Sequence, residues 1–232
     1  STDECPTFDE LFSRMTNAPA VMAFIGSIFD DKSSREQFPY IYGEGENGKG
    51  RLVEFLQWQL GDAATMANVP KGDSTKRWFN AQAYNKRLVC FGECDQFSFA
   101  TSEEMKAITG NSYVLVDEKG EKIFRGRAIC KFLYASNVKP NVERVAAHKR
   151  RVIFATMEPI KGSPMSPRAY DLKLRSEGHA FLSKCWREYQ RLGAAGGSIS
   201  TDAEVFTQLA EHNEEEFQEI VEPQDSDPLL PV

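Results

Sequence analysis

A glycine-rich turn between a short apolar run and a helical pattern, within residues 38–52, constrains the fold more than any other stretch of the chain. Residues 40–42 form the apolar run. Beyond the turn, apolar residues recur at the spacing of one helix face, at Leu52, Phe55, Leu56 and Leu60. A strand, a G-x-x-x-x-G-K turn and a helix in this order form a phosphate-binding P-loop. The sequence therefore predicts an α/β fold organised around this turn.

The turn has the residue types that an anion site needs. Glycines let consecutive backbone N–H groups converge on a phosphate, and the helix N-terminus adds unpaired donors and the positive end of its dipole. Lys49 supplies a charge for the outer phosphates of ATP. The predicted cofactor-binding residues are Gly43, Gly45, Glu46, Asn47, Gly48, Lys49, Gly50 and Arg51. The less favoured alternative is a solvated glycine turn that happens to carry a lysine.

One position departs from the usual loop. Gly50 stands where a serine or threonine commonly offers its hydroxyl to Mg²⁺. This departure weakens the prediction of bound Mg²⁺ more than the prediction of bound nucleotide.

Composition limits the class of protein. The 232 residues, 41% of them hydrophobic, suit one medium α/β domain with a helical appendage. There is no apolar run of about 18 residues that would predict a membrane span, and no signal peptide is visible. The five cysteines are scattered and the three histidines lie far apart, which favours a reducing, cytoplasmic location and disfavours a zinc site. The start at Ser1 suggests a fragment or a processed chain.

The pattern divides the chain into four parts. The parts are an N-terminal helical unit at 1–37, a P-loop core at 38–160, a C-terminal helical segment at 161–221 and a flexible tail at 222–232. In the first part, Thr7 and Glu10 have the spacing of a helix capping box. A helix is predicted over residues 74–84 with Phe79 at its surface or in a groove. A long amphipathic helix is predicted after the loop at 161–168.

Acidic residues follow a second buried strand, residues 88–91. In open α/β sheets a carboxylate at the carboxyl end of a central strand faces the crevice where ligands bind. Glu93 and Asp95 are therefore predicted to hold Mg²⁺ or to orient an attacking water. An ordinary solvated strand end remains the alternative, and it applies more to Asp95 than to Glu93.

Two further positions at strand ends carry candidate chemistry. Residues 128–136 are predicted as a buried strand that ends at Asn137, whose amide can bond the γ-phosphate or the water. Arg151 directly precedes the next strand, residues 152–155. Such an arginine is either an exposed charge or a finger that stabilises charge on a phosphoryl group in a neighbouring subunit, with Arg150 as the alternative finger.

Charge is distributed unevenly along the chain. The net charge of −6 argues against a simple nucleic-acid coat, but residues 119–151 hold ten Lys or Arg against two acids. Residues 113–124 are predicted as a β-hairpin whose tip carries Lys119 and Lys122. Those lysines are either solvated or contact a nucleic-acid backbone. From residue 201 onward there are ten acids and no Lys or Arg.

The order of these motifs resembles that of superfamily 3 helicases of small viruses, phages and plasmids, and most of all the helicase half of phage and plasmid primase–helicases. The resemblance covers roughly residues 20–190. It rests on Gly43-x-Gly45-x-Asn47-Gly48-Lys49, on Asn85-Lys-Arg87-Leu-Val followed by Glu93, on Met105-Lys106-x-x-Thr109-Gly110-Asn111, on the strand ending in Asn137, and on Arg151 before Val-Ile-Phe.

The resemblance implies an AAA+-like P-loop three-layer sandwich with a mainly parallel sheet, a small N-terminal helical unit and C-terminal helices. It implies a ring-forming ATP hydrolase, with a hexamer expected, that moves 3′ to 5′ on single-stranded DNA during DNA replication in the host cytoplasm. A primase or polymerase domain can precede such a chain. The implied roles are phosphate binding by Lys49, water activation or Mg²⁺ binding by Glu93, γ-phosphate sensing by Asn137, finger by Arg151, and DNA contact by Lys119 and Lys122 at the pore.

Other classes fit parts of the pattern. A packaging or remodelling motor would share Lys49, Glu93 and Asn137 but has no need of the hairpin. An ATP-binding origin-recognition or assembly subunit with little hydrolysis is consistent with Gly50. A nucleotide or small-molecule kinase fits least, because it has no place for the finger or the hairpin.

Overall fold

The computed structural model describes residues 4–33, 36–68, 79–92, 108–110, 113–117, 122–138, 151–160, 162 and 165–193. Its described helices are α1 (Pro6–Ser13), α2 (Ala18–Ser27), α3 (Lys49–Leu60), the short 3₁₀ helix η1 (Gly61–Ala63) and α8 (Pro167–Gly193). Its strands are β1 (Phe38–Tyr42), β2 (Ala64–Ala67), β3 (Leu88–Phe91), β4 (Tyr113–Val116), β5 (Phe124–Arg127), β6 (Lys131–Ser136) and β7 (Val152–Thr156). Residues 79–83 are also helical.

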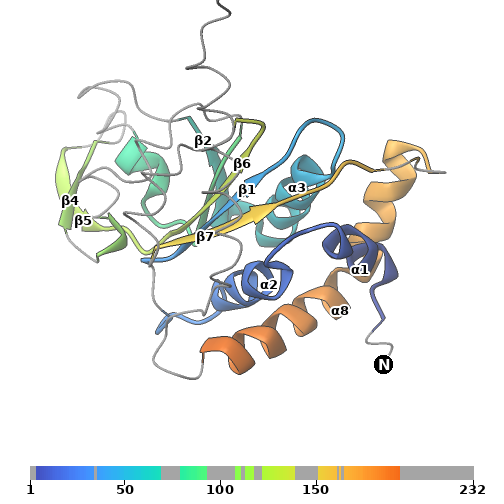
Figure 1. Cartoon of the computed structure of the whole chain (residues 1–232). Coiled ribbons are helices and arrows are strands. Elements are labelled where there is room, and N and C mark those ends of the chain that lie inside the picture. The colour runs from blue at the N-terminus through green and yellow to red at the C-terminus, as the bar shows by residue number, and fades with distance from the viewer. Residues whose placement is uncertain are drawn as a thin grey trace, which may run out of the picture.

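Five strands form a parallel sheet in the order β2-β3-β6-β1-β7 (Figure 1). In the register of the central strands, Tyr40 of β1 lies between Tyr134 of β6 and Phe154 of β7. Because all five strands run the same way, the segments that follow β1, β3 and β6 emerge at one edge of the sheet. The predicted α/β class with a mainly parallel sheet is confirmed.

Side chains alternate between two different surfaces of this sheet, as a pleated strand requires. One surface, here called the aromatic face, presents large rings from four strands: Phe38, Tyr40, Phe91, Phe132, Tyr134 and Phe154. The other, here called the helical face, presents smaller aliphatic and thiol groups: Ile41, Leu88, Cys90, Leu133, Ala135, Ile153 and Ala155. The small groups leave room for the large side chains that the helices bring.

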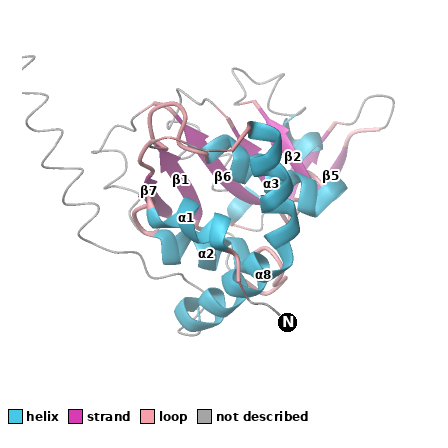
Figure 2. Ribbon diagram, turned by 90° about the vertical axis from the view of Figure 1, so that its right-hand side faces the viewer, coloured by secondary structure: helices cyan, strands magenta, loops and turns pink. Residues whose placement is uncertain are grey.

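The helical face is covered by α1, α2, α3 and α8, which share one buried cluster (Figures 1 and 2). Phe8 of α1 stacks on Phe181 of α8 with ring centroids 3.8 Å apart, and Phe55 of α3 meets Phe8 edge-on at 4.8 Å. Each ring pair of this kind adds about 0.5–1.5 kcal/mol beyond the burial of its area. The helical unit and the long amphipathic helix predicted from the sequence are thus one packed layer with the P-loop helix.

The aromatic face is covered in part by residues 79–83 and by the antiparallel hairpin of β4 and β5. Asn80 donates its side-chain amide to the carbonyl of Leu115 at 3.0 Å, and Tyr84 meets Phe124 edge-on. The predicted hairpin is confirmed in its strands, whereas its tip at residues 118–121 lies outside the described residues.

Some local predictions are wrong. Thr7 is not a helix cap, because α1 starts at Pro6 and the Thr7 hydroxyl donates to Glu177 at 2.7 Å. Phe79 is buried at 2% exposure within the aromatic cluster rather than lying at the surface. The strand predicted from residue 128 begins at Lys131.

The sequence reading also missed the edge strand β2, which has four residues with little β-propensity. The four cysteines within the described ranges are free and buried. No cluster of three or more metal-binding side chains occurs in the part of the chain that the structure describes. Within that same part, no helix combines the length and the apolar character needed to cross a membrane.

Candidate functional site

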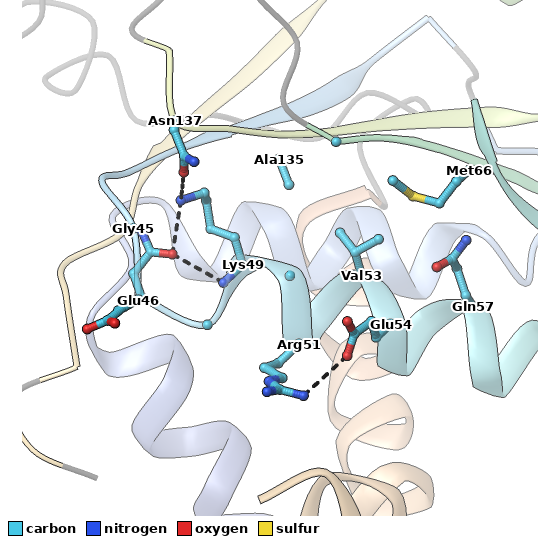
Figure 3. Close-up of a pocket in the computed structure, with 14 residues that line it drawn as sticks. Gly45, Glu46, Lys49, Arg51, Val53, Glu54, Gln57, Met66, Ala135 and Asn137 are labelled. Atoms are coloured by element: carbon cyan, nitrogen blue, oxygen red, sulfur yellow. Dashed lines mark hydrogen bonds and ion pairs between the residues drawn. The ribbon is translucent and has the colours of Figure 1, made fainter. Parts of the chain in front are cut away.

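A pocket of about 540 Å³ opens at the carboxyl edge of the sheet, beside the N-terminus of α3 (Figure 3). The loop and the first turn of α3 line it continuously from Gly45 to Arg51. The remaining wall comes from α3 and from the ends of three strands, through Val53, Glu54, Gln57, Met66, Gly92, Ala135 and Asn137. All the predicted cofactor-binding residues except Gly43 line this pocket.

Two glycines of the loop are required by its geometry. Gly48 has a φ of +95°, a conformation that residues with a side chain rarely adopt. At Gly43 a Cβ atom would lie 2.2 Å from the side-chain nitrogen of Asn47 and 2.5 Å from the carbonyl oxygen of Met157. The absence of a side chain at Gly43 therefore allows the Asn47 side chain to fold back against the loop.

Lys49 lies at the centre of the site and is almost fully buried, at 6% exposure. Its Nζ donates to the side-chain oxygen of Asn47 at 3.0 Å, to that of Asn137 at 2.9 Å and to the carbonyl of Gly43. Figure 3 shows the side chain reaching from the start of α3 toward Asn137. These contacts are to oxygen acceptors, so the oxygens of an oligophosphate can take their places without a change in the type of partner.

Asn137 reaches the pocket because the end of β6 is fixed to β1. The hydroxyl of Tyr40 donates to the carbonyl of Val138 at 2.9 Å, and the Gly43 N–H donates to the carbonyl of Ser136 at 3.3 Å. The residue after the strand is therefore held beside the P-loop. The structure thus brings together Lys49 and Asn137, which are 88 positions apart in the sequence.

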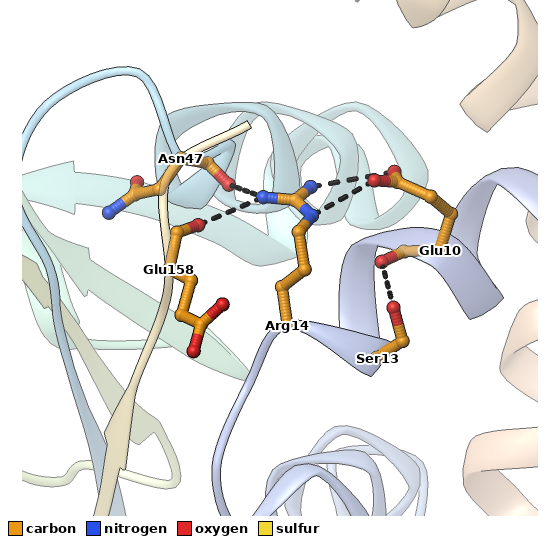
Figure 4. A network of polar contacts seen from close by, with 5 residues as sticks. All are labelled: Glu10, Ser13, Arg14, Asn47 and Glu158. Carbon is orange, nitrogen blue, oxygen red and sulfur yellow. Dashed lines mark hydrogen bonds and ion pairs between the residues drawn. The ribbon is translucent and has the colours of Figure 1, made fainter. Parts of the chain in front are cut away.

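Arg14, at the end of α1, contacts the backbone of the loop at Asn47 and does not line the pocket (Figure 4). Its Nη1 donates to the backbone carbonyls of Asn47 at 3.1 Å and Glu158 at 3.0 Å, while its Nε donates to Glu10 at 2.9 Å. The Arg14 side chain is only 14% exposed. The guanidinium group therefore fixes the P-loop to the segment that follows β7 and to α1.

A second link joins the site to α8. Nη1 of Arg51 lies 2.8 and 3.0 Å from the two carboxylate oxygens of Asp171, and 3.4 Å from the carboxylate of Glu54. Thr7 of α1 is in turn bonded to Glu177 of α8 through both its N–H and its hydroxyl. The helical layer thus contacts the first turn of α3 as well as the loop.

Several predicted site residues lie outside the described residues: Glu93, Asp95, Lys119 and Arg150. Gly92, directly before Glu93, lines the pocket at the end of β3. Lys122 is described and is exposed just before β5, at the turn end of the hairpin. Their assigned roles stay predictions.

Arg151 lies at the edge of the sheet opposite the pocket, since it directly precedes β7 and its carbonyl accepts the N–H of Phe38 at the start of β1. Its Nη1 lies 3.5 Å from the hydroxyl of Thr109, and its Nη2 lies 4.0 Å from the carboxylate of Glu36. The structure does not bring Arg151 together with Lys49 in one chain.

The basic segment is not one continuous surface. Lys131 is buried at 4% exposure with its Nζ 5.8 Å from the ring centroid of Phe24. The exposed basic side chains of the described part of the segment are on the hairpin, at Lys122, Arg125 and Arg127, and Arg127 lies over the ring of Tyr113. These basic residues are close together in the sequence, but the sequence pattern did not show which of their side chains are buried and which are exposed.

Sequence reasoning missed Arg14 and Asp171, because neither belongs to a motif. The only local signal at Arg14 is its i,i+4 pairing with Glu10 on a helix. Its contacts to Asn47 and Glu158 depend on residues 33 and 144 positions away.

A family of unknown function, DUF5906, matches residues 41–151. This match begins in β1, includes the P-loop and ends at Arg151. No curated protein matches the sequence.

Three solved structures of the C-terminal region of NrS-1 are similar to this chain. One, an A form apo structure, has a TM-score of 0.64 at 14% identity over 90% of this chain and 51% of that one. A second A form apo structure has a TM-score of 0.57 at 15% identity, over 89% of this chain and 47% of that one. A further apo structure has a TM-score of 0.59 at 16% identity, over 95% of this chain and 53% of that one. The chain spans about half the length of these structures, and at such identities the fold alone is shared.

Proposed function

We propose that this chain is the ATP-driven motor of a DNA helicase of the phage or plasmid replication type, which assembles as a ring, with a hexamer expected. The observation that carries the proposal is the meeting of Lys49 and Asn137 in one pocket at the carboxyl edge of a parallel sheet, 2.9 Å apart. A P-loop lysine beside a strand-end amide suits recognition of the γ-phosphate, which differs between ATP and its hydrolysis product.

The strand order supports the finer, AAA+-like assignment. β6 lies between β1, which leads into the P-loop, and β3, which leads to Glu93. A strand inserted between these two is typical of AAA+-like P-loop ATPases. The ends of β3 and β6, which lead to Glu93 and Asn137 in the sequence, are therefore neighbours at the carboxyl edge of the sheet.

The position of Arg151 is consistent with a shared site in a ring. The pocket of the same chain lies at the opposite edge of the sheet, so the proposed role of Arg151 is at a phosphate bound by another subunit. In this proposal Lys49 binds the β- and γ-phosphates, Glu93 orients water, Asn137 senses the γ-phosphate and Arg151 stabilises charge across the interface.

A strand-displacement assay with ATP tests the proposal, using forked DNA with 3′ or 5′ single-stranded tails. The chain is expected to unwind the fork with the 3′ tail, and Lys49→Ala is expected to lose unwinding and ATP turnover by at least about a hundredfold, because its charged contacts to the phosphates are lost. Normal ATP turnover in Lys49→Ala would contradict the P-loop assignment. Turnover without unwinding on either fork would favour a packaging or remodelling motor.

Gly50 specifically favours a second candidate, an ATP-binding origin-recognition or assembly subunit that hydrolyses little. A chain of this kind would bind ATP and form rings on DNA, yet a single-turnover experiment would show no release of phosphate. The helicase proposal predicts phosphate release that DNA stimulates.

A further inference from the structure

The helix that carries the P-loop lysine lacks the expected hydroxyl group next to that lysine but carries a carboxylate one turn further on. Gly50 stands in the first turn of α3, where a hydroxyl would commonly contact Mg²⁺. A Cβ atom built at Gly50 would have no atom within 4 Å, so the space beside the phosphate site is open at this point. An oxygen ligand from elsewhere on the pocket wall can therefore approach.

Glu54 supplies a carboxylate on the pocket wall one turn along α3 from that space. It lies one helical turn beyond Gly50, on the same strip of α3 that lines the pocket (Figure 3). Helix side chains tilt toward the helix N-terminus, so a residue covers the turn that precedes it. The Glu54 carboxylate follows this rule, because its Oε2 lies 3.4 Å from Nη1 of Arg51 in the first turn.

The present partner of Glu54 is easily exchanged. Arg51 is bonded at 2.8 and 3.0 Å to both oxygens of Asp171, which leaves the 3.4 Å contact with Glu54 as its longer one. The Glu54 side chain is 66% exposed, and ion pairs between exposed side chains contribute about 0–1 kcal/mol. Arg51 thus keeps its main partner when the Glu54 carboxylate turns toward a cation.

The chemistry of the pocket suits Mg²⁺ bound together with phosphate. Mg²⁺ prefers oxygen ligands and is usually held by one or two carboxylates, the phosphates of the substrate and several waters. Glu54 offers such a carboxylate on the part of the pocket wall that α3 forms. Among the described residues there is no cluster of three or more acidic, histidine or cysteine side chains that could bind the ion without phosphate.

We propose that Glu54 contacts the Mg²⁺ of a bound Mg²⁺–nucleoside triphosphate, directly or through one water, in place of the hydroxyl that Gly50 lacks. The inference rests on the proposed function, because it requires ATP at the P-loop. It assigns to α3 itself a metal contact in addition to those predicted for Glu93 and Asp95.

The experiment measures the affinity of mant-ATP by fluorescence in Mg²⁺ and in EDTA, and takes the ratio of the two dissociation constants. Glu54→Gln is expected to lower the Mg²⁺-dependent strengthening roughly tenfold or more, while the affinity in EDTA changes less than about twofold. Asp62→Asn is the matched control, since it removes one carboxylate just beyond the other end of α3, outside the pocket. It is expected to leave the ratio unchanged.

A rescue separates a metal contact from a general effect of charge. In Gly50→Ser/Glu54→Gln the serine hydroxyl has room in the open space and is expected to restore most of the Mg²⁺ dependence. Restoration supports the assignment. An unchanged ratio in Glu54→Gln, or an equal loss in Asp62→Asn, overturns it while the proposed function stands. Absence of mant-ATP binding by the unaltered chain in both buffers overturns the proposed function, and this inference falls with it.

Discussion

The two faces of the sheet are connected to the pocket in different ways. On the helical face, Arg14 bonds the backbone of the P-loop and Asp171 bonds Arg51 of its helix. On the aromatic face, the hairpin is fixed to Asn80 and Tyr84 but leaves large apolar side chains partly exposed. These exposed residues are Tyr113, Leu115, Ile123 and Phe124.

One sheet can thus serve two purposes. The helical face holds the loop in one geometry, since α1, α3 and α8 form a single buried cluster with polar links to the loop. The hairpin presents exposed apolar and basic side chains beyond the aromatic cluster, and surfaces of this kind commonly contact partners. Changes on the helical face should therefore affect nucleotide binding, and changes on the hairpin should affect contacts to other molecules.

The largest expected effect is that of Phe181→Ala in α8. Phe181 is 1% exposed and contacts Phe8, Phe12 and Phe55, so the change leaves a cavity between three helices. The free energy of unfolding is expected to fall by about 3–5 kcal/mol, measured by denaturant titration. Leu172→Ala, on the same helix but 59% exposed, is expected to cost less than about 0.5 kcal/mol. Equal losses would contradict the assigned packing of α8.

Arg14→Met should break the link between α1 and the loop. The backbone carbonyls of Asn47 and Glu158 lose their charged donor, which is expected to cost about 1–3 kcal/mol of stability and to weaken ATP binding roughly tenfold. Arg14→Lys, which keeps one cationic donor, is expected to recover part of the affinity. Glu10→Gln serves as the control, because it removes the ion pair and leaves both carbonyl contacts in place. Unaltered ATP affinity in a stably folded Arg14→Met would show that the loop does not depend on the helical face.

The hairpin can be tested through the salt dependence of single-stranded DNA binding. Lys122→Ala removes an exposed charge at the turn end of the hairpin, and if Lys122 contacts a phosphate the slope of log affinity against log salt should fall by about 0.7. Lys173→Ala removes an exposed charge from α8 on the helical face and should leave the slope unchanged. A larger change for Lys173→Ala would place the DNA on the other side of the molecule.

The smallest expected effect is on the pH dependence of stability, through the hydrogen bond between Tyr189 of α8 and Asp30, just after α2. Burial, followed by the hydrogen bond to Asp30 at 2.6 Å, raises the pKa of Tyr189 to about 12. The same hydrogen bond holds the pKa of Asp30 below its usual value. Because the folded state binds the tyrosine proton more tightly, its contribution to stability is complete below about pH 10 and is lost as the pH rises through the raised pKa.

Tyr189→Phe should therefore lessen the fall in stability between about pH 10 and 12, measured from denaturation midpoints. Tyr113→Phe is the comparison on the hairpin, where the tyrosine is 63% exposed, and it should leave the alkaline fall as it is. The same alkaline fall in Tyr189→Phe and in the unaltered chain would show that this pair does not couple α2 to α8.

Local patterns predicted much of the site. Residues close together in the sequence were enough to locate the strand, turn and helix around Lys49 and the strand that ends before Asn137. Hydrophobic periodicity, glycine content and strand length are all local properties. The hairpin was found for the same reason. The short edge strand β2 escaped detection because four residues without β-branched or aromatic enrichment give too weak a local signal.

Local residue patterns were therefore sufficient to predict an α/β core with a P-loop motif and an amide at a strand end. The packing of distant segments was needed to show that Arg14 holds the loop, that Asp171 binds Arg51, that Lys131 is buried and that Arg151 lies at the far edge of the sheet. The physical reason is that these facts depend on which segments pack together. Burial and ion pairing across 33 or 120 positions are set by the shape of the whole core, which no local periodicity records.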